Sequence, residues 1–440
     1  MLDVLRNRTY RHLFLAQVIA LLGTGLATVA LGLLAFDLAK ADAGAVLGTA
    51  LAIKMVAYIG VAPVASAFAQ HLPRRAVLVA LDLVRAGVAL ILPFVNQVWQ
   101  IYVLIFVLQT ASAAFTPTFQ ATIPEVLPDE GDYTRALSLS RLAYDMESLV
   151  SPALAALLLS VVSYHSLFAG TVVGFLASAA LVVSVVLPAA ATGPRRSIYD
   201  RTTRGLRIYL ATPRLRGLLA LNLAIAAGSS MVIVNTVVIV QSGFGMTQTA
   251  TAAALACFGA GSMLVALALP KVLESLPERP VMLGGAVLIA VGLLLGFFAA
   301  RWYGLLLPLW FALGMGYSLA QTPSGRLLRR SASEADRPAL FAAQFALSHA
   351  CWLITYPLAG WLGARAGLPV SFLVLGAVAL FSVFLAARYW RGQDVEELEH
   401  SHAGMASDHP HLSTAQGNVK SGHRHSHAFV IDDDHPNWPR

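Results

Sequence analysis

The stretch AAATGPRRSIYDRTTRGLRIYLATPRLR, residues 189–216, is the longest polar interruption in a chain that is almost continuously apolar between residues 12 and 390. On each side of it the sequence shows six apolar spans, each near the length of about 20 residues that a helix needs to cross a bilayer. Short gaps marked by polar residues, Pro or Gly separate the spans. The pattern predicts an all-α membrane protein with twelve transmembrane helices in two six-helix halves.

The composition excludes the common soluble classes. Apolar residues make up 57% of the chain and charged residues 12%, about half the roughly 25% charge of an ordinary soluble domain. Neither a soluble globular enzyme nor a disordered protein can expose this much apolar surface to water. A membrane β-barrel is excluded as well, because its strands alternate polar and apolar residues over only about 10 positions.

Positive charge predicts the orientation of the spans. Lys and Arg collect on the cytoplasmic side of a membrane, and here the arginine clusters precede the first span or fall in the gaps that follow even-numbered spans. The opposite gaps hold only Lys40, Arg301 and Arg365. We therefore expect a multi-pass protein of the bacterial inner membrane with both termini in the cytoplasm. The net charge of +7 then reflects this topology and does not indicate nucleic-acid binding.

The central polar stretch also sets the domain organisation. We expect an N-terminal half over residues 1–188, a basic cytoplasmic linker over 189–216, a C-terminal half over 217–390 and a flexible His-rich cytoplasmic tail over 391–440. The two halves repeat the same sequence features: spans 4 and 10 both end in Pro-containing segments, and spans 5 and 11 both contain Pro. Such six-plus-six repeats occur in secondary transporters that bind substrate near the bilayer midplane, between the halves.

Histidine is concentrated at the end of the chain, where eight of the 12 histidines fall in the last 41 residues. Neutral imidazole is a common ligand of Ni, Zn, Cu and Co, and His-x-His spacing lets several rings converge on one ion. We expect the tail to bind a transition metal; a solvated tail of biased composition is the alternative. The candidate ligands are His400, His402, His409, His411, His423, His425, His427 and His435.

Four ionisable residues lie deep inside predicted spans, where a charge costs roughly 2.5–3.5 kcal/mol and usually faces a cavity or a partner. They are Lys54 in span 2, Asp145 and Glu147 in span 5, and His349 in span 11. We expect them to line the transport pathway or to couple it to protons. Asp145 and Glu147 are about 200° apart around a helix, so both cannot face the cavity squarely. The alternatives are a packing ion pair with Lys54 or Arg141, and a satisfied core histidine.

Over residues 1–390 the chain resembles the major facilitator superfamily. The resemblance rests on LRNRTYR at 5–11, LPRR at 72–75, Asp82 with Arg85, FTP at 115–117 and Ile123-Pro124. The family's loop between spans 2 and 3 usually reads G-x-L-A-D-R-x-x-R-R, whereas residues 66–75 read SAFAQHLPRR. The body is most similar to the branch of siderophore and metal exporters. With its His-rich tail the whole chain resembles NreB-type nickel-resistance exporters.

The resemblance implies that spans 5 and 8, and spans 2 and 11, are neighbours across the two halves. That arrangement would place the carboxylates of span 5 near Cys257, and Lys54 near His349 and Cys351, although a buried cysteine is usually a small apolar filler. At the loop between spans 2 and 3 we expect structural gating, with a local ion pair positioning the loop. The residues concerned are Asp82, Arg85, Arg74 and Arg75.

The energy source is inferred from the lysines. A Walker A loop needs Lys directly after Gly, but the four lysines follow Ala39, Ile53, Pro270 and Val419. We therefore expect secondary active transport, in which an ion gradient supplies the energy. We also expect the exporter to be a monomer, not to be an enzyme and to hold no tightly bound cofactor. The predicted cargo is a divalent transition metal, nickel first and cobalt next, expelled by proton antiport to confer metal resistance. The alternatives are an exporter of a siderophore or drug-like molecule, and a membrane-anchored metal buffer or sensor.

Overall fold

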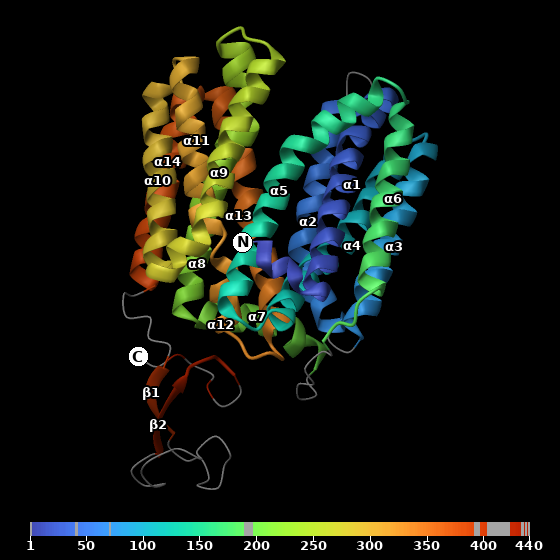
Figure 1. Ribbon diagram of the computed structural model, residues 1–440. Helices are drawn as coiled ribbons and strands as arrows, with labels where there is room; N and C mark the ends of the chain where they lie inside the picture. The colour runs from blue at the N-terminus through green and yellow to red at the C-terminus, as the bar shows by residue number, and fades with distance from the viewer. Residues whose placement is uncertain are drawn as a thin grey trace.

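The computed structural model describes residues 2–39, 43–69, 72–188, 197–390, 397–402 and 423–432, together with residues 435 and 438. Twelve long helices form two bundles of six (Figure 1), which confirms the predicted fold class. The N-terminal half contains α1 (Arg8–Ala39), α2 (Ala43–Ala69), α3 (Arg74–Ile91), α4 (Val98–Val126), α5 (Glu130–Leu159) and α6 (Tyr164–Val183). The C-terminal half contains α8 (Pro213–Val237), α9 (Gln248–Ser275), α10 (Glu278–Ala299), α11 (Tyr303–Gln321), α13 (Arg337–Arg365) and α14 (Leu368–Tyr389).

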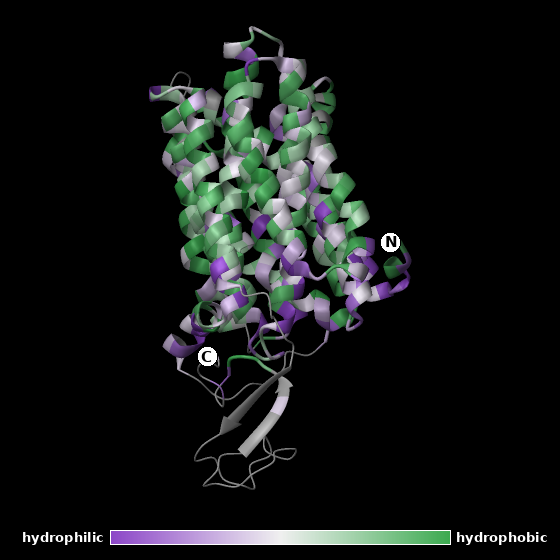
Figure 2. Cartoon of the chain, turned by 90° about the vertical axis from the view of Figure 1, so that its left-hand side faces the viewer, coloured by the Kyte–Doolittle hydropathy of each residue, from purple (hydrophilic) through white to green (hydrophobic). Residues whose placement is uncertain are grey.

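The helices present apolar side chains to the outside of the bundle. Figure 2 shows apolar residues over its flanks and hydrophilic residues gathered at the end where both termini lie. In the described part of the chain, ten helical segments are long and apolar enough to cross a membrane. Of the two remaining long helices, α2 contributes the apolar stretch Ala52–Phe68, and α5 carries Arg141, Asp145 and Glu147 along its length. The bundle is therefore built to sit in a bilayer.

The two halves repeat the same packing. In the N-terminal half α1 packs on α5 and α6, α2 on α4, and α3 on α4 and α6. In the C-terminal half α8 packs on α13 and α14, α9 on α11, and α10 on α11 and α14. Each of these contacts in one half thus has its counterpart in the other, and each half has its own apolar core. This is the internal repeat that the two sets of six spans predicted.

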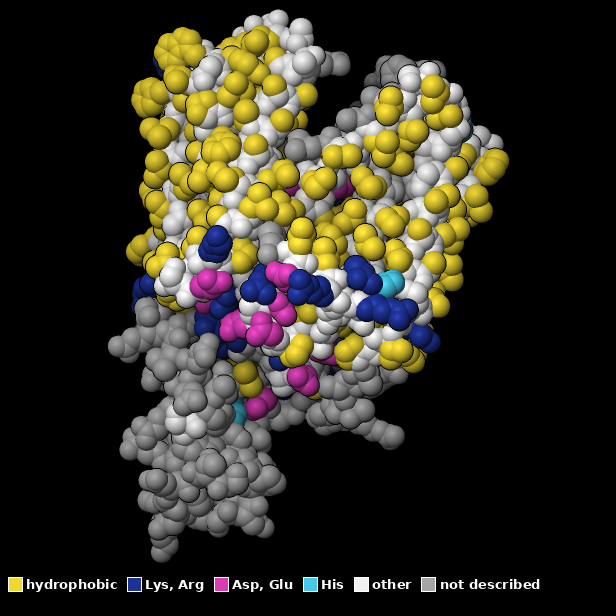
Figure 3. All heavy atoms as spheres, in the orientation of Figure 1, with side chains coloured by type: hydrophobic (Ala, Val, Ile, Leu, Met, Phe, Trp, Pro, Cys, Tyr) yellow, Lys and Arg dark blue, Asp and Glu magenta, His cyan; other side chains and the backbone are white. Residues whose placement is uncertain are grey.

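The halves meet at one end and separate at the other. Figure 3 shows a hollow between them, with acidic side chains visible in its floor, that opens away from the end carrying both termini. We call the end with both termini the basic end and the opposite end the open end. The contacts across the halves run between α2 and α13, α5 and α9, and α4 and α13. Spans 5 and 8, and spans 2 and 11, are therefore neighbours, as the resemblance implied.

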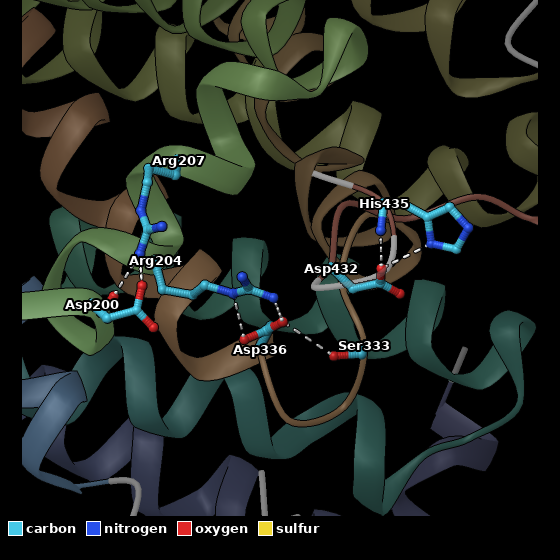
Figure 4. Close-up of polar contacts among 7 residues, drawn as sticks. All are labelled: Asp200, Arg204, Arg207, Ser333, Asp336, Asp432 and His435. Carbon is cyan, nitrogen blue, oxygen red and sulfur yellow. Dashed lines mark hydrogen bonds and ion pairs between the residues drawn. The ribbon is translucent and has the colours of Figure 1, made fainter. Parts of the chain in front are cut away.

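Helix α7 (Ile198–Ala211) occupies half of the predicted linker and crosses the basic end. It packs closely on α13, since a Cβ on Gly205 would lie 2.0 Å from the carbonyl oxygen of Ala339. Arg204 binds Asp336, at the start of α13, through two hydrogen bonds of 3.2 and 3.0 Å (Figure 4). The buried Tyr209 hydroxyl donates to Gln344 at 2.6 Å, and burial raises the pKa of Tyr209, so the hydroxyl keeps its proton. The described part of the linker thus contains a helix fixed to the C-terminal half.

Smaller elements complete the ends of the bundle. A 3-10 turn η1 (Leu2–Arg6) precedes α1, a second, η3 (Leu92–Phe94), ends α3, and a π-helical turn η4 (Val238–Gly243) extends α8. The short helix α12 (Ser324–Arg330) follows α11 at the basic end. In α4 both Pro117 and Pro124 lie inside the helix, which continues to Val126.

The described part of the tail has structure. Strands β1 (Glu397–His402) and β2 (His423–Ala428) pair antiparallel, and the chain then returns to the C-terminal half. There Phe429 and Ile431 are only 3% and 5% exposed, in the same apolar core as Leu327 and Leu328 of α12. The Arg214 guanidinium lies 5.3 Å from the Trp438 ring centroid. The tail was predicted to be flexible; its described residues contain a paired ladder and a packed segment.

Candidate transport pathway

Glu147 lies where α5 meets α1. Its side chain is half-buried, and a Cβ on Gly25 of α1 would approach its Oε1 atom to 2.9 Å. Such a Cβ would also overlap Ser151, one turn further along α5, at 2.2 Å. The absence of a side chain at Gly25 therefore lets α1 and α5 approach closely and leaves space for the carboxylate.

Lys54 and His349 bring the two halves together beside Glu147. The Lys54 ammonium lies 5.4 Å from the ring centroid of Tyr58, one turn along α2. Tyr58 makes an edge contact of 4.7 Å with His349 of α13, and its ring lies 4.8 Å from that of Phe345. Lys54 is close enough to act electrostatically on both Glu147 and His349. The charge of Lys54 thus acts on a carboxylate of one half and on an imidazole of the other.

The hydrogen bond of His349 fixes which ring nitrogen carries the hydrogen in the neutral form. Its Nδ1 atom lies 2.7 Å from the carbonyl oxygen of Phe345, which can only accept. Nδ1 therefore donates, and the lone pair resides on Nε2. A backbone-oriented imidazole of this kind is a typical metal ligand.

Asp145 has a different environment from Glu147. It is 2% exposed, forms an ion pair with Arg141 on the preceding turn, and accepts a hydrogen bond of 2.6 Å from Ser262 of α9. Arg141 in turn donates to the Tyr317 hydroxyl of α11 at 3.0 Å and lies over its ring. The two carboxylates thus point to different neighbours around α5, as their spacing predicted. For Asp145, the ion pair with Arg141 corresponds to the packing alternative stated above.

The residues predicted to gate the loop between spans 2 and 3 lie within one half. The ion pair between Asp82 and Arg85 forms as predicted, and Asp82 also accepts a hydrogen bond of 2.8 Å from Ser178 of α6. Arg74 binds Glu125 of α4 through two hydrogen bonds of 2.5 and 2.7 Å. Arg75 is exposed. The paired members of this group therefore fasten α3 to α4 and α6.

The basic end is closed by α12. Arg326 forms ion pairs with Glu130 of α5 and, at 2.8 Å, with Glu278 of α10, and it donates to the Thr134 hydroxyl at 3.0 Å. Arg329 donates to the carbonyl oxygen of Pro128, just before α5. A basic helix of the C-terminal half thus binds the acidic start of α5 across the interface.

The remaining candidate ligands are spread over the chain. Cys351 is buried in α13, and Cys257 is half-buried in α9. His435 is 4% exposed and lies 2.8 Å from Asp432, packed against the Phe429 ring (Figure 4). His400, His402, His423, His425 and His427 lie in the two strands, and His409 and His411 lie outside the described residues. Among the described residues no three His, Cys, Asp or Glu side chains gather as metal ligands would.

The comparison with family models decides the class of the protein. The model for the Major Facilitator Superfamily matches residues 13–224 and again residues 218–418. The chain belongs to the major facilitator superfamily. Members of this superfamily are membrane transporters and not enzymes, so the prediction that the chain is not an enzyme is confirmed.

The chain is similar to two curated relatives over part of its length. Macrolide efflux protein A of Streptococcus pyogenes is 26% identical over 152 residues, or 32% of this chain and 37% of that protein. The uncharacterized transporter YfiS of Bacillus subtilis is 28% identical over 106 residues, or 24% of this chain and 25% of that protein. Both matches thus span well under half of the relative's length.

The structural likeness extends over nearly the whole bundle. The human organic anion transporter MFSD10 superposes with a TM-score of 0.75 at 12% identity, covering 86% of this chain and 99% of that one. A bacterial homologue of the iron transporter ferroportin, in an outward-facing state, superposes with a TM-score of 0.73 at 13% identity, covering 87% and 99%. At such identity the likeness establishes the major facilitator fold alone.

Sequence reasoning did not predict several of the polar contacts that join the halves of this major facilitator protein. Four residues that contribute to them are Tyr317, Ser262, Glu130 and Arg326. For two of them a signal was present, because an acidic segment follows span 4 and a basic one follows span 10. Opposite charge at equivalent positions of two repeats predicts attraction once the repeats face each other.

Proposed function

We propose that this transporter is a secondary active exporter of a divalent transition metal, nickel first and cobalt next, driven by proton antiport. The basic end then faces the cytoplasm of a bacterial cell, and the hollow opens to the outside. One observation carries the proposal: the His349 ring of α13 lies 4.7 Å from the Tyr58 ring of α2, and the Lys54 ammonium, 5.4 Å from that same ring, acts electrostatically on both His349 and Glu147. Carboxylate and imidazole are both ligands that divalent transition metals accept.

The backbone register of the tail supports a role in metal capture. His400 pairs with His425, and His402 with His423, across the antiparallel ladder. Directly paired residues, and residues two apart, share one face of a ladder. The four positions therefore share a face, on the side of the membrane where an exporter collects its cargo.

The membrane potential supports coupling to protons. Moving one positive charge out of a cell against 100 mV costs about 2.3 kcal/mol, and a dication costs about twice that. Entering protons offset this cost. Asp145, Glu147 and His349 are the titratable groups that lie near the interface of the halves.

A second candidate is export of an organic molecule. The matched segments of macrolide efflux proteins favour it. In that case the hollow between the halves receives the organic cargo, and the histidine ladder is incidental to transport.

Uptake of radiolabelled Ni²⁺ into inverted vesicles tests the proposal. We expect uptake that requires an acidic vesicle interior, disappears with a protonophore and is lost in Glu147→Gln. Glu274→Gln is the matched control, since Glu274 is exposed near the basic end of α9. Failure of the wild-type protein to take up Ni²⁺ or Co²⁺ rules out metal export, and uptake of a labelled macrolide in its place establishes the second candidate.

A further inference from the structure

Three apolar side chains near the end of the tail fasten it to the C-terminal half. Phe429 and Ile431 are 3% and 5% exposed and belong to the apolar core of that half. Trp438 packs against the same core, with its ring 5.1 Å from the Phe429 ring and 5.3 Å from the Arg214 guanidinium. We call Phe429, Ile431 and Trp438 the anchor. It gives the tail a second attachment to the bundle, in addition to the chain that leaves α14.

A turn brings the members of the anchor together. The backbone N–H of His435 donates to Oδ1 of Asp432 at 2.8 Å, and the backbone N–H of Asp432 donates to the carbonyl oxygen of His435 at 3.2 Å. Both hydrogen bonds use backbone atoms of His435, so this turn does not depend on the imidazole.

The outer end of the histidine ladder lies next to the anchor in the chain. Glu397, the first residue of β1, pairs with Ala428, the last residue of β2, and Phe429 follows directly. The chain approaches β1 from Trp390, which is 1% exposed and accepts a hydrogen bond of 2.7 Å from Arg279 at its carbonyl oxygen. The paired end of the ladder is thus preceded and followed by residues packed on the same half.

The ladder needs support of this kind. A pair of strands with no third strand and no packed face is at best marginally stable in water. Residues 403–422 connect the strands, and so long a connection does not set the register as a two-residue turn would. Register is decisive, because a slip of one residue moves every position of a strand to the other face. In the observed register one face holds His400, His402, His423, His425 and His427.

We propose that the anchor is a positioning element for metal binding, which holds the strands in the register that places these histidines on one face. This inference rests on the proposed role of the ladder in metal capture. The anchor side chains do not ligate the metal; they raise the fraction of molecules in which the ladder is paired. If the strands alone pair about one-tenth of the time, loss of the anchor weakens the apparent metal affinity about tenfold.

Calorimetric titration of the full-length protein with Ni²⁺ tests the inference. The ladder's share is the binding that is lost when its paired histidines are replaced by Gln. We expect Phe429→Ser combined with Ile431→Ser to weaken this share about tenfold, because pairing then loses its support. Val430→Ser is the matched control, since Val430 lies between the two and is more exposed than either. It should keep the wild-type affinity.

A cross-link separates positioning from a general loss of structure. Glu397 and Ala428 are directly paired, and the separation of directly paired residues in an antiparallel ladder suits a disulfide. Glu397→Cys with Ala428→Cys, once oxidised, fixes the outer end of the ladder without the anchor. Adding this disulfide to the Phe429→Ser, Ile431→Ser variant should restore the wild-type affinity, and adding it to the protein with an intact anchor should change nothing.

Two outcomes would overturn the inference and leave the proposed function standing. Wild-type affinity in the variant without the anchor would mean that the ladder pairs unaided. Failure of the disulfide to restore the affinity would mean that the anchor acts by some route other than strand pairing. A wild-type protein whose Ni²⁺ binding does not depend on the ladder histidines would instead remove the proposed role of the ladder, and this inference with it.

Discussion

Gly25 controls the position of Glu147, because α1 approaches α5 at that residue. We expect Gly25→Ala to push Ser151 and the Glu147 carboxylate away, since the added Cβ would lie 2.2 Å from Ser151 and 2.9 Å from Glu147. Overpacking of this kind typically costs about 1–3 kcal/mol. Transport should therefore fall more steeply than expression, and the measurement is the rate of cargo uptake per folded transporter in inverted vesicles.

Gly32 is the matched control for this prediction. It lies two turns further along α1, and a Cβ there would meet no atom within 4 Å. Gly32→Ala should therefore keep the wild-type uptake rate and slightly favour the helix, since Ala has the higher helix propensity. Equal uptake rates in the two alanine variants would show that close contact at Gly25 does not position Glu147.

At the scale of the element, α7 acts as a brace for the C-terminal half. The side chains of Arg204 and Asp336 are 8% and 7% exposed, so removing one partner leaves a buried charge. We expect Asp336→Asn to destabilise the protein by about 3–5 kcal/mol, the usual cost of breaking a buried ion pair. Thermal unfolding in detergent measures the effect.

The same helix offers the control for the brace. Arg207 and Asp200 form an ion pair whose side chains are 55% and 30% exposed (Figure 4). A pair this exposed contributes about 0–1 kcal/mol. Asp200→Asn should therefore unfold close to the wild-type temperature, and an equally large loss in both variants would mean that burial does not distinguish the two pairs.

The histidine ladder can be tested without disturbing the packed end of the tail. A fourfold variant removes the imidazoles at the paired positions of the ladder and keeps Phe429 and Ile431 in the core. Its substitutions to Gln are at His400, His402, His423 and His425. We expect weaker Ni²⁺ binding by the full-length protein in calorimetry and reduced, not abolished, metal tolerance. His435→Gln is the comparison, because His435 is packed against Phe429. Unchanged Ni²⁺ affinity in the fourfold variant would contradict a binding role for the ladder.

The elements show what the sequence could predict and what it could not. The length of the apolar spans predicted the long helices, because that length follows from the thickness of the bilayer. Helices α7 and α12 were missed, since short helices that pack across the end of a bundle leave no such signal in a basic linker. The spacing of Asp145 and Glu147 predicted their divergence, but their partners Ser262 and Gly25 depend on how helices distant in sequence approach each other.

At the scale of the whole molecule, the interface of the halves has a graded composition. Toward the hollow it holds Glu147, Lys54 and His349, which carry charge or a lone pair. Its next contacts are the hydrogen bonds of Asp145 and Arg141 to the C-terminal half. At the basic end it holds the ion pair of Arg326 with Glu130 and the hydrogen bond of Arg329 to Pro128. Opening the basic end therefore requires polar contacts to break, and these contacts set the balance between the two open states.

The contacts of α12 predict how that balance can be shifted. Arg326 binds Glu130 at the start of α5, and Arg329 binds the carbonyl of Pro128, so Arg326→Gln combined with Arg329→Gln removes these two links between the halves at the basic end. We expect the halves to separate there, because the contacts that remain along α5 are fewer. Spin labels at the exposed residues Asp129 and Ser275, with both native cysteines replaced by Ala, measure the separation.

The double variant should show a longer and broader distance distribution between these labels than the otherwise unchanged protein. Arg279→Gln is the control, because Arg279 donates to the carbonyl oxygen of Trp390 within the C-terminal half, at 2.7 Å. It should leave the distribution unchanged. If the double variant keeps the short distance, closure of the basic end is carried by the hydrogen bonds of Arg141 and Asp145 and the aromatic contacts of Tyr58, and α12 only follows the movement of its half.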